Sequence, residues 1–171
     1  LNGLEMTNAR GTGIVKDQRL TFEDLSLSVL GGRVGMDGFY ETLDVTRPTF
    51  AVDLALDSLD IAGASAAFNT VRALAPIAQY TQGTFSSSLR LSRALGQDLA
   101  PALEVLDGDG SLTTSRLAIE GLPLLDRLAE TLRVQRFSNP TVDAVRSSIR
   151  IQGGRLVVDP FPVGVAGTGM S

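Results

Sequence analysis

A strand pattern that occurs twice, near the two ends of the chain, constrains the fold more than any other feature. In residues 19–29 apolar side chains alternate with polar ones, change phase after an acidic residue, and then alternate again. Residues 155–165 repeat this order around Asp159. A repeated unit with one apolar and one polar face is typical of an extended array of strands. The pattern therefore predicts a fold dominated by β-sheet.

Other segments carry the same alternation. Residues 25–30 and 33–40 flank Gly31-Gly32, and a two-residue glycine turn of this kind favours an antiparallel hairpin because glycine tolerates positive φ. Four further strands are predicted at residues 48–56, 83–91, 110–120 and 141–151, before the last strand at 155–165.

Three stretches have helical spacing instead. Residues 62–75 place apolar side chains three and four apart, and Pro76 follows them. Asp98 is a suitable N-cap for a short helix that runs through Leu106, and residues 124–132 form an amphipathic stripe after Pro123. We expect these helices to lie against the sheet. The predicted fold class is β-rich α+β, a curved, mainly antiparallel sheet or trough with two or three short amphipathic helices, in a single domain over residues 1–171.

The helices are too few to cover the apolar face of such a sheet. A helix about 10 Å wide shields roughly two strands spaced about 4.8 Å apart, so about three of eight or nine strands remain uncovered. Curling of the sheet, a neighbouring repeat or the acyl chains of lipid are the candidate covers; a closed core beneath the helices is the alternative. The predicted apolar lining consists of Phe22, Leu25, Leu27, Val29, Phe50, Val52, Leu54, Leu56, Phe85, Leu89 and Leu91.

Composition narrows the possible functions. The 171 residues contain no histidine and no cysteine, which removes histidine proton shuttles, thiol nucleophiles and zinc sites built from those ligands. A net charge of -4 and an aromatic content of 5% argue against a nucleic-acid surface, which normally has a basic stripe. We expect no cofactor and no nucleic-acid partner.

Candidate catalytic residues have simpler structural explanations. Asp53, Asp57 and Glu41 are candidates for an acid and base pair or a divalent-ion site, but Asp53 and Asp57 lie on the polar side of one predicted strand. Residues 107–110 resemble the start of a calcium loop but lack its later glycine and glutamate, so they are interpreted as a turn.

Two further motifs are equally weak. Gly11-Thr12-Gly13 begins a phosphate-loop pattern but is interpreted as a strand turn, and a serine–lysine dyad would require Lys16, which is predicted to lie in a strand. Phe68-Asn69-Thr70 could mark a lipid gate, but inward packing of Phe68 on an amphipathic helix explains it. We therefore expect no enzymatic activity.

A series of turn and packing signals resembles the C-terminal region of AsmA-like proteins. The signals are Ser58-Leu59-Asp60-Ile61, Phe68-Asn69-Thr70-Val71, Leu74-Ala75-Pro76, Gly83-Thr84-Phe85-Ser86, Leu89-Arg90-Leu91, Leu95, Asp98-Leu99, Pro101, Gly108-Asp109-Gly110, Ile119-Glu120-Gly121, Gly153-Gly154-Arg155-Leu156 and Asp159-Pro160-Phe161. The resemblance covers most of the chain. Its motifs identify a fold better than an activity.

This resemblance implies a bacterial envelope protein that is anchored in the inner membrane and has a periplasmic β trough. Such proteins are linked to outer-membrane biogenesis and are proposed to move phospholipid between membranes; they are similar in plan to TamB and to bridge-like lipid-transfer proteins. The implied partners are phospholipid acyl chains and adjoining repeats. Alternatively, the segment is a protein-interaction module or a structural cap.

The sequence also bears on membrane contact. Leu1 is not a Met, and no signal peptide follows it, so we expect an excised piece of a longer protein. The longest apolar stretch, residues 61–78, is interrupted by Asn69, Arg72 and Pro76 and is not a membrane span. Contact with a membrane is therefore expected through segments outside these residues.

Overall fold

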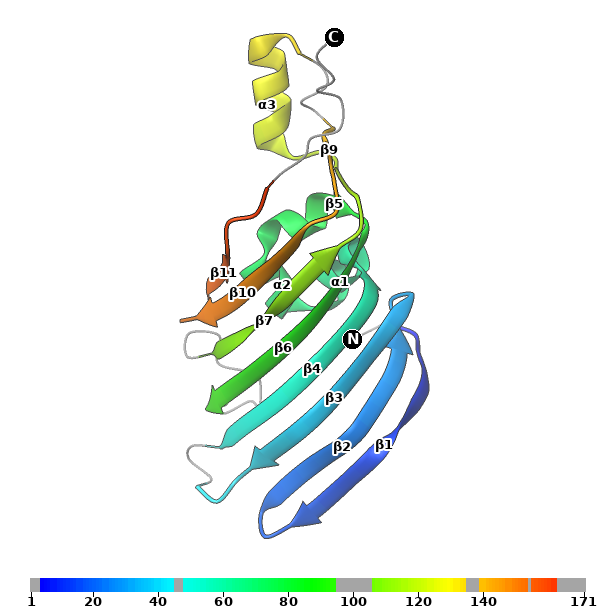
Figure 1. The fold of residues 1–171 in the computed structure, drawn as a ribbon, viewed down its shortest axis with the longest axis vertical. Helices are drawn as coiled ribbons and strands as arrows, with labels where there is room; N and C mark the ends of the chain where they lie inside the picture. Colours follow the sequence, from blue (N-terminus) through cyan, green and yellow to red (C-terminus); the bar gives the residue numbers. More distant parts are fainter. Residues whose placement is uncertain (1–3, 45–47, 95–105, 135–138, 154, 163–171) are drawn as a thin grey trace.

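In a computed structural model of the protein, eight antiparallel strands form one curved sheet (Figure 1). The structure describes residues 4–44, 48–94, 106–134, 139–153 and 155–162. In order across the sheet, the strands are β1 (Met6–Lys16), β2 (Arg19–Val29), β3 (Gly32–Glu41), β4 (Thr49–Asp60), β6 (Thr84–Ala94), β7 (Asp107–Thr114), β10 (Arg146–Gln152) and β11 (Arg155–Val158). The sheet is open, with β1 and β11 at its edges, and the predicted β-rich α+β class is confirmed.

A second, three-stranded sheet was not predicted. It contains β5 (Thr81–Gln82), β8 (Leu117–Ile119) and β9 (Thr141–Val142). The predictions of single strands over 110–120 and 141–151 are wrong, because each segment is divided between the large sheet and the small one. The buried Thr114 hydroxyl accepts a hydrogen bond from the backbone N–H of Val145 at 3.0 Å, which holds the two segments together where they leave the large sheet.

The first predicted helix is divided into two, and the third is confirmed. Residues 62–75 do not form one helix, because Phe68 is extended (φ -119°, ψ 113°) and separates α1 (Ile61–Ala67) from α2 (Asn69–Leu74). A 3₁₀ helix, η1 (Pro76–Tyr80), follows. The third predicted helix is confirmed as α3 (Pro123–Leu132) with proline in its first turn. The helix expected from Asp98 falls almost entirely outside the described residues.

The phase change in β2 is a β-bulge. The β2–β3 register shifts between Phe22 and Leu25, and Asp24 has a φ of 53°. The backbone N–H of Asp24 donates to the Asp37 carboxylate on β3 at 2.8 Å, which satisfies the amide that the bulge removes from the ladder. Because a bulge inserts one residue, the apolar side chains on both sides of it face the same way.

The second copy of the pattern behaves differently. Strand β11 ends at Val158, so the prediction of one strand over 155–165 is wrong; residues 163–165 lie outside the described residues. Asp159 stays beside β10 through a hydrogen bond from its N–H to the carbonyl oxygen of Ser148 at 3.0 Å. Pro160 and Pro162 follow, and proline cannot donate to a strand ladder. The repeat therefore predicts the start of β11 but not its length.

Three glycine-containing segments differ from their predicted turns. The β2–β3 turn consists of Leu30 and Gly31, both with positive φ, and Gly32 already belongs to β3. Residues 11–13 lie within β1, and residues 107–110 begin β7. In β7 the glycines allow close approach of strands: a Cβ at Gly110 would lie 1.9 Å from the Ser88 carbonyl oxygen. Gly108 and Gly110 are therefore needed for close strand packing and do not form a turn.

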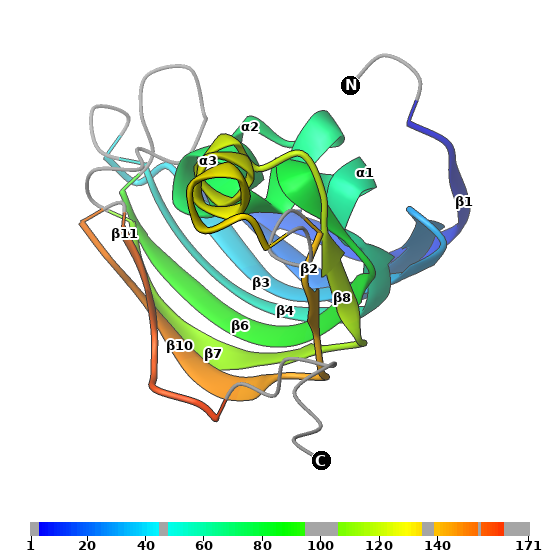
Figure 2. The same ribbon diagram turned by 90° about the horizontal axis from the view of Figure 1, so that it is seen from above.

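The sheet is concave toward α1 and α2 (Figure 2). The buried side chains Val29 and Leu59 belong to the sheet, and Ile61 and Ala64 belong to α1. Asp60 caps α1 by accepting a hydrogen bond from the Gly63 N–H at 2.6 Å, so the helix starts where β4 ends. The core is therefore densest where the strands meet these helices.

Candidate functional site

Strand register places the predicted apolar lining on one face of the sheet. Residues directly opposite each other in neighbouring strands point to the same face. Phe22 aligns with Gly38, Val52 and Leu91, while Leu25 aligns with Met36, Leu54 and Leu89, and Leu27 with Val34 and Leu56. Phe50 lies on the same face of β4, and Phe85 pairs with Leu59 beyond a second bulge at Ser58. These side chains form what we call the apolar face.

The register also adds members that the sequence analysis did not name. Alternation within β3 and β10 could have found several of them, since β3 alternates Val34 and Met36 with Arg33 and Asp37. The added members are Leu20, Val34, Met36, Tyr40, Leu59, Leu112, Ile149, Ile151 and Leu156. One row runs from Phe22 in β2 to Leu156 in β11 and so crosses seven strands.

Burial divides the apolar face into two parts. Of the eleven predicted lining residues only Val29 is buried, at 5% exposed, and the other ten are half-buried. Leu59, beside α1, is 4% exposed. Since Val29 and Leu59 are buried and α1 and α2 lie on the concave side, the apolar face is the concave one. It is closed at Val29 and Leu59, near the helices, and at Ile149 and Ile151 of β10, which are 5% and 4% exposed, and it is incompletely covered between these two regions.

Glycines leave parts of this face without side chains. A Cβ at Gly108 would lie 2.5 Å from Leu91 Cδ2, so Leu91 extends over the backbone of the next strand. Gly38 and Gly110 lie in the same or the neighbouring row. Because large apolar side chains lie next to glycine backbone, the concave surface is uneven in height, and the glycines add no polar side chain to it.

The opposite, polar face accounts for the carboxylates that were considered as catalytic candidates. Asp53 pairs with Arg90 across the strands at 3.1 Å, and Glu41 lies 3.7 Å from Arg19. Asp57 accepts a hydrogen bond from the Ser58 hydroxyl at 2.9 Å. These carboxylates have separate partners instead of facing each other, and no group of three or more potential metal ligands occurs among the described residues.

Residues 68–70, for which helix packing was predicted and a lipid gate was the alternative, map to the break between α1 and α2. Phe68 is half-buried and extended, so it does not lie within a helix as expected. The exposed Asn69 side chain accepts a hydrogen bond from Arg72.

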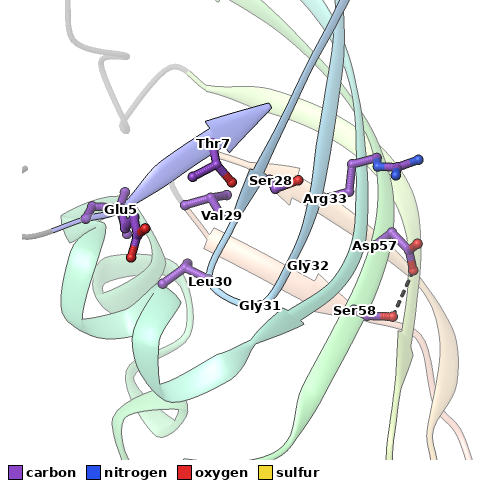
Figure 3. A pocket seen from close by; sticks show the side chains of 11 residues that line it. Glu5, Thr7, Ser28, Val29, Leu30, Gly31, Gly32, Arg33, Asp57 and Ser58 are labelled. Carbon is purple, nitrogen blue, oxygen red and sulfur yellow. Dashed lines mark hydrogen bonds between the residues drawn. The ribbon is translucent and has the colours of Figure 1, made fainter. Parts of the chain in front are cut away.

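A cavity of about 780 Å³ lies at the ends of β1, β2 and β3 (Figure 3). Thr7, Ser28, Arg33, Asp57 and Ser58 contribute to its lining. Arg33 and Asp57 are exposed. Val29 of the apolar face and Leu30 also line the cavity, so its lining is mixed in polarity, and we assign it no chemistry.

The fold and the site define a class: an open, curved antiparallel sheet with an incompletely covered apolar concave face. No protein-family model, curated protein or solved structure matches the chain. The resemblance to AsmA-like proteins therefore stays a prediction. None of the described helices has the length and apolar character needed to cross a membrane.

Proposed function

We propose that this chain is a non-enzymatic module of a β trough that shields or conducts phospholipid, with acyl chains held on the apolar face. The observation that carries the proposal is the half-buried state of ten of the eleven lining side chains. Full burial of a Leu, Val or Phe side chain is worth about 1.5–3 kcal/mol, so covering what remains exposed is favourable. Acyl chains match this surface because they need no hydrogen-bond partner.

The dimensions of the apolar face support the proposal. The row from Phe22 to Leu156 crosses seven strands, which at about 4.8 Å per step gives roughly 29 Å. The hydrocarbon core of a bilayer is about 30 Å thick and contains two layers of acyl chains, so one layer is about 15 Å. The row is therefore about twice as long as one extended acyl chain, so a chain can lie along it over its full length.

The setting of this function rests on the resemblance to AsmA-like proteins. It places the module in the periplasm of a bacterial envelope, next to adjoining repeats of a longer protein with an inner-membrane anchor. Transfer of phospholipid between the inner and outer membranes would then require the apolar face to continue through those repeats.

Photocrosslinking tests whether lipid occupies this face. A diazirine amino acid at Leu54 should label phospholipid that copurifies with the protein, and the same group at Ala55 should give at least tenfold less. Ala55 is the matched control because it is the next residue of β4 and points to the polar face. Mass spectrometry of organic extracts identifies the lipid. Absence of phospholipid from extracts of gently purified protein, or equal labelling at both positions, would contradict the proposal.

A second candidate function is assembly through the β1 edge. All of β1 is exposed, and Val15, at 79% exposed, lies on the same face as Leu20. An unpaired edge of this length can accept a strand from a partner or an adjoining repeat.

Sedimentation velocity tests this second function. Association that increases with concentration and is lost in Val15→Lys favours assembly, because a charge beside the edge opposes strand pairing. Val157→Lys in the short edge strand β11 is the control and should leave β1-mediated association intact. A monomer at all concentrations argues against self-association through β1.

A further inference from the structure

Helix α3 carries a leucine stripe that the apolar face does not include. Leu124, Leu128 and Leu132 are 73%, 42% and 52% exposed. Their spacing of four residues places them along one side of the helix. On the adjoining side Leu125 is half-buried and Ala129 is buried, and that side fixes the helix.

The helix has defined ends. Pro123 starts it, and Arg133 terminates it in the left-handed conformation (φ 54°). The N–H of Arg133 donates to the carbonyl oxygen of Glu130 at 3.2 Å and the N–H of Val134 to that of Ala129 at 3.0 Å, as in a Schellman cap. α3 stands beyond the β11 end of the large sheet (Figure 1) and, seen from above, over its concave side (Figure 2). The stripe is therefore held at one extremity of the molecule.

The size of the stripe decides what can bind it. Ten residues at 1.5 Å each make a helix about 15 Å long and, with side chains, about 10 Å wide, so its footprint is on the order of 150 Å². A stable protein partner needs about 800 Å² on each side. A lipid surface has no such minimum, because an amphipathic helix binds in proportion to the apolar area it buries in the interface. We propose that α3 inserts Leu124, Leu128 and Leu132 into the interfacial region of a lipid surface.

Charge specifies the kind of surface. The polar side of the helix carries Asp126 and Glu130 against Arg127 and the following Arg133, so it is neutral overall. The whole chain has a net charge of -4. Binding therefore cannot depend on attraction to anionic lipid and should be insensitive to salt. Insertion of α3 into a lipid surface differs from the expectation that membrane contact comes only from segments outside this chain. The proposal for α3 goes beyond the proposed function, because it does not require lipid on the apolar face.

Vesicle flotation with the full 171-residue chain tests the inference. On small phosphatidylcholine vesicles, the triple variant Leu124→Ser/Leu128→Ser/Leu132→Ser should partition about a hundredfold less than the unaltered protein. The matched control is Ile14→Ser/Leu43→Ser/Val157→Ser, which removes three exposed apolar side chains that lie outside the apolar face and should leave partition unchanged. Circular dichroism checks that both variants keep the fold.

A spectroscopic readout supplements flotation. The chain has no tryptophan, so Leu128→Trp gives a single reporter, and its emission should shift to the blue when vesicles are added. The emission of Ile14→Trp, on the opposite face of β1 from Val15, should not shift. Unchanged partition of the α3 variant, equal loss in the control variant, or binding only to anionic vesicles would overturn the proposal. So would a dimer that the α3 substitutions dissociate, which would point to a protein partner. Crosslinking of lipid at Leu54 should be the same in the α3 variant, which separates this result from the proposed function.

Discussion

Gly38→Ala is expected to lower the free energy of unfolding by about 3 kcal/mol, which makes it one of the most damaging single substitutions in the sheet. A Cβ at this position would lie 2.2 Å from the carbonyl oxygen of Ala51 and 2.8 Å from the Cα of Val52 on β4. These are backbone atoms, so the strands must separate to make room. The φ of Gly38 is 148°, which L side chains rarely adopt, and adds strain.

Gly35→Ala on the same strand is the matched control. A Cβ there would lie 3.6 Å from the Cβ of Ala55, which is ordinary van der Waals contact. Alanine also lowers the conformational entropy of the unfolded chain. We therefore expect the free energy of unfolding of Gly35→Ala to be unchanged or to rise by up to about 1 kcal/mol. Urea unfolding of the two variants and the unaltered protein measures the difference. Similar stabilities for the two variants would show that β3 and β4 do not approach as closely at Gly38 as described.

Alternation of apolar residues was sufficient to predict β2, β3, β4 and β6 and to place eleven residues on the apolar face. Phe50, Val52, Leu54 and Leu56 alternate without interruption, and strand geometry requires them to share a face. The phase change in residues 19–29 also had a direct structural meaning, a bulge at Asp24. Both predictions succeeded because they depend only on local periodicity.

Glycine positions were harder to interpret from sequence. Gly108 and Gly110 can be explained either by a turn or by close strand approach, and only the neighbours Leu91 and Ser88 distinguish the two. Those neighbours are distant in sequence. The small sheet formed by β5, β8 and β9 has the same origin, since it depends on pairing between segments that are distant in sequence.

The role of the apolar face could not be predicted from its residues alone. The same alternating side chains are required for a closed core and for a lipid-binding surface. The difference lies in what covers each residue, as Leu59 and Leu54 illustrate: both point to the apolar face of β4, but Leu59 is buried and Leu54 is half-buried. Substitutions at these two positions separate the structural from the functional part of the face.

Leu59→Ala is expected to lower the free energy of unfolding by about 3 kcal/mol, because it removes buried methyl groups and leaves a cavity beside α1. Leu54→Ala should cost about half as much, because solvent already reaches part of that side chain. Urea unfolding measures both values.

The loss of bound phospholipid should be larger for Leu54→Ala than for Leu59→Ala, which is the opposite of the ranking by loss of stability. Leu54→Ala is expected to reduce the phospholipid recovered per mole of protein several-fold, since about 25 cal/mol of stabilisation is lost for each Å² of apolar contact removed. Leu59→Ala should leave it unchanged under conditions where the variant stays folded, because lipid cannot reach a side chain that is only 4% exposed. If Leu54→Ala costs as much stability as Leu59→Ala and does not alter lipid recovery, Leu54 belongs to a closed core. The ranking of the two variants by loss of stability and their ranking by loss of lipid together distinguish an apolar face that lipid covers from one that the protein itself covers.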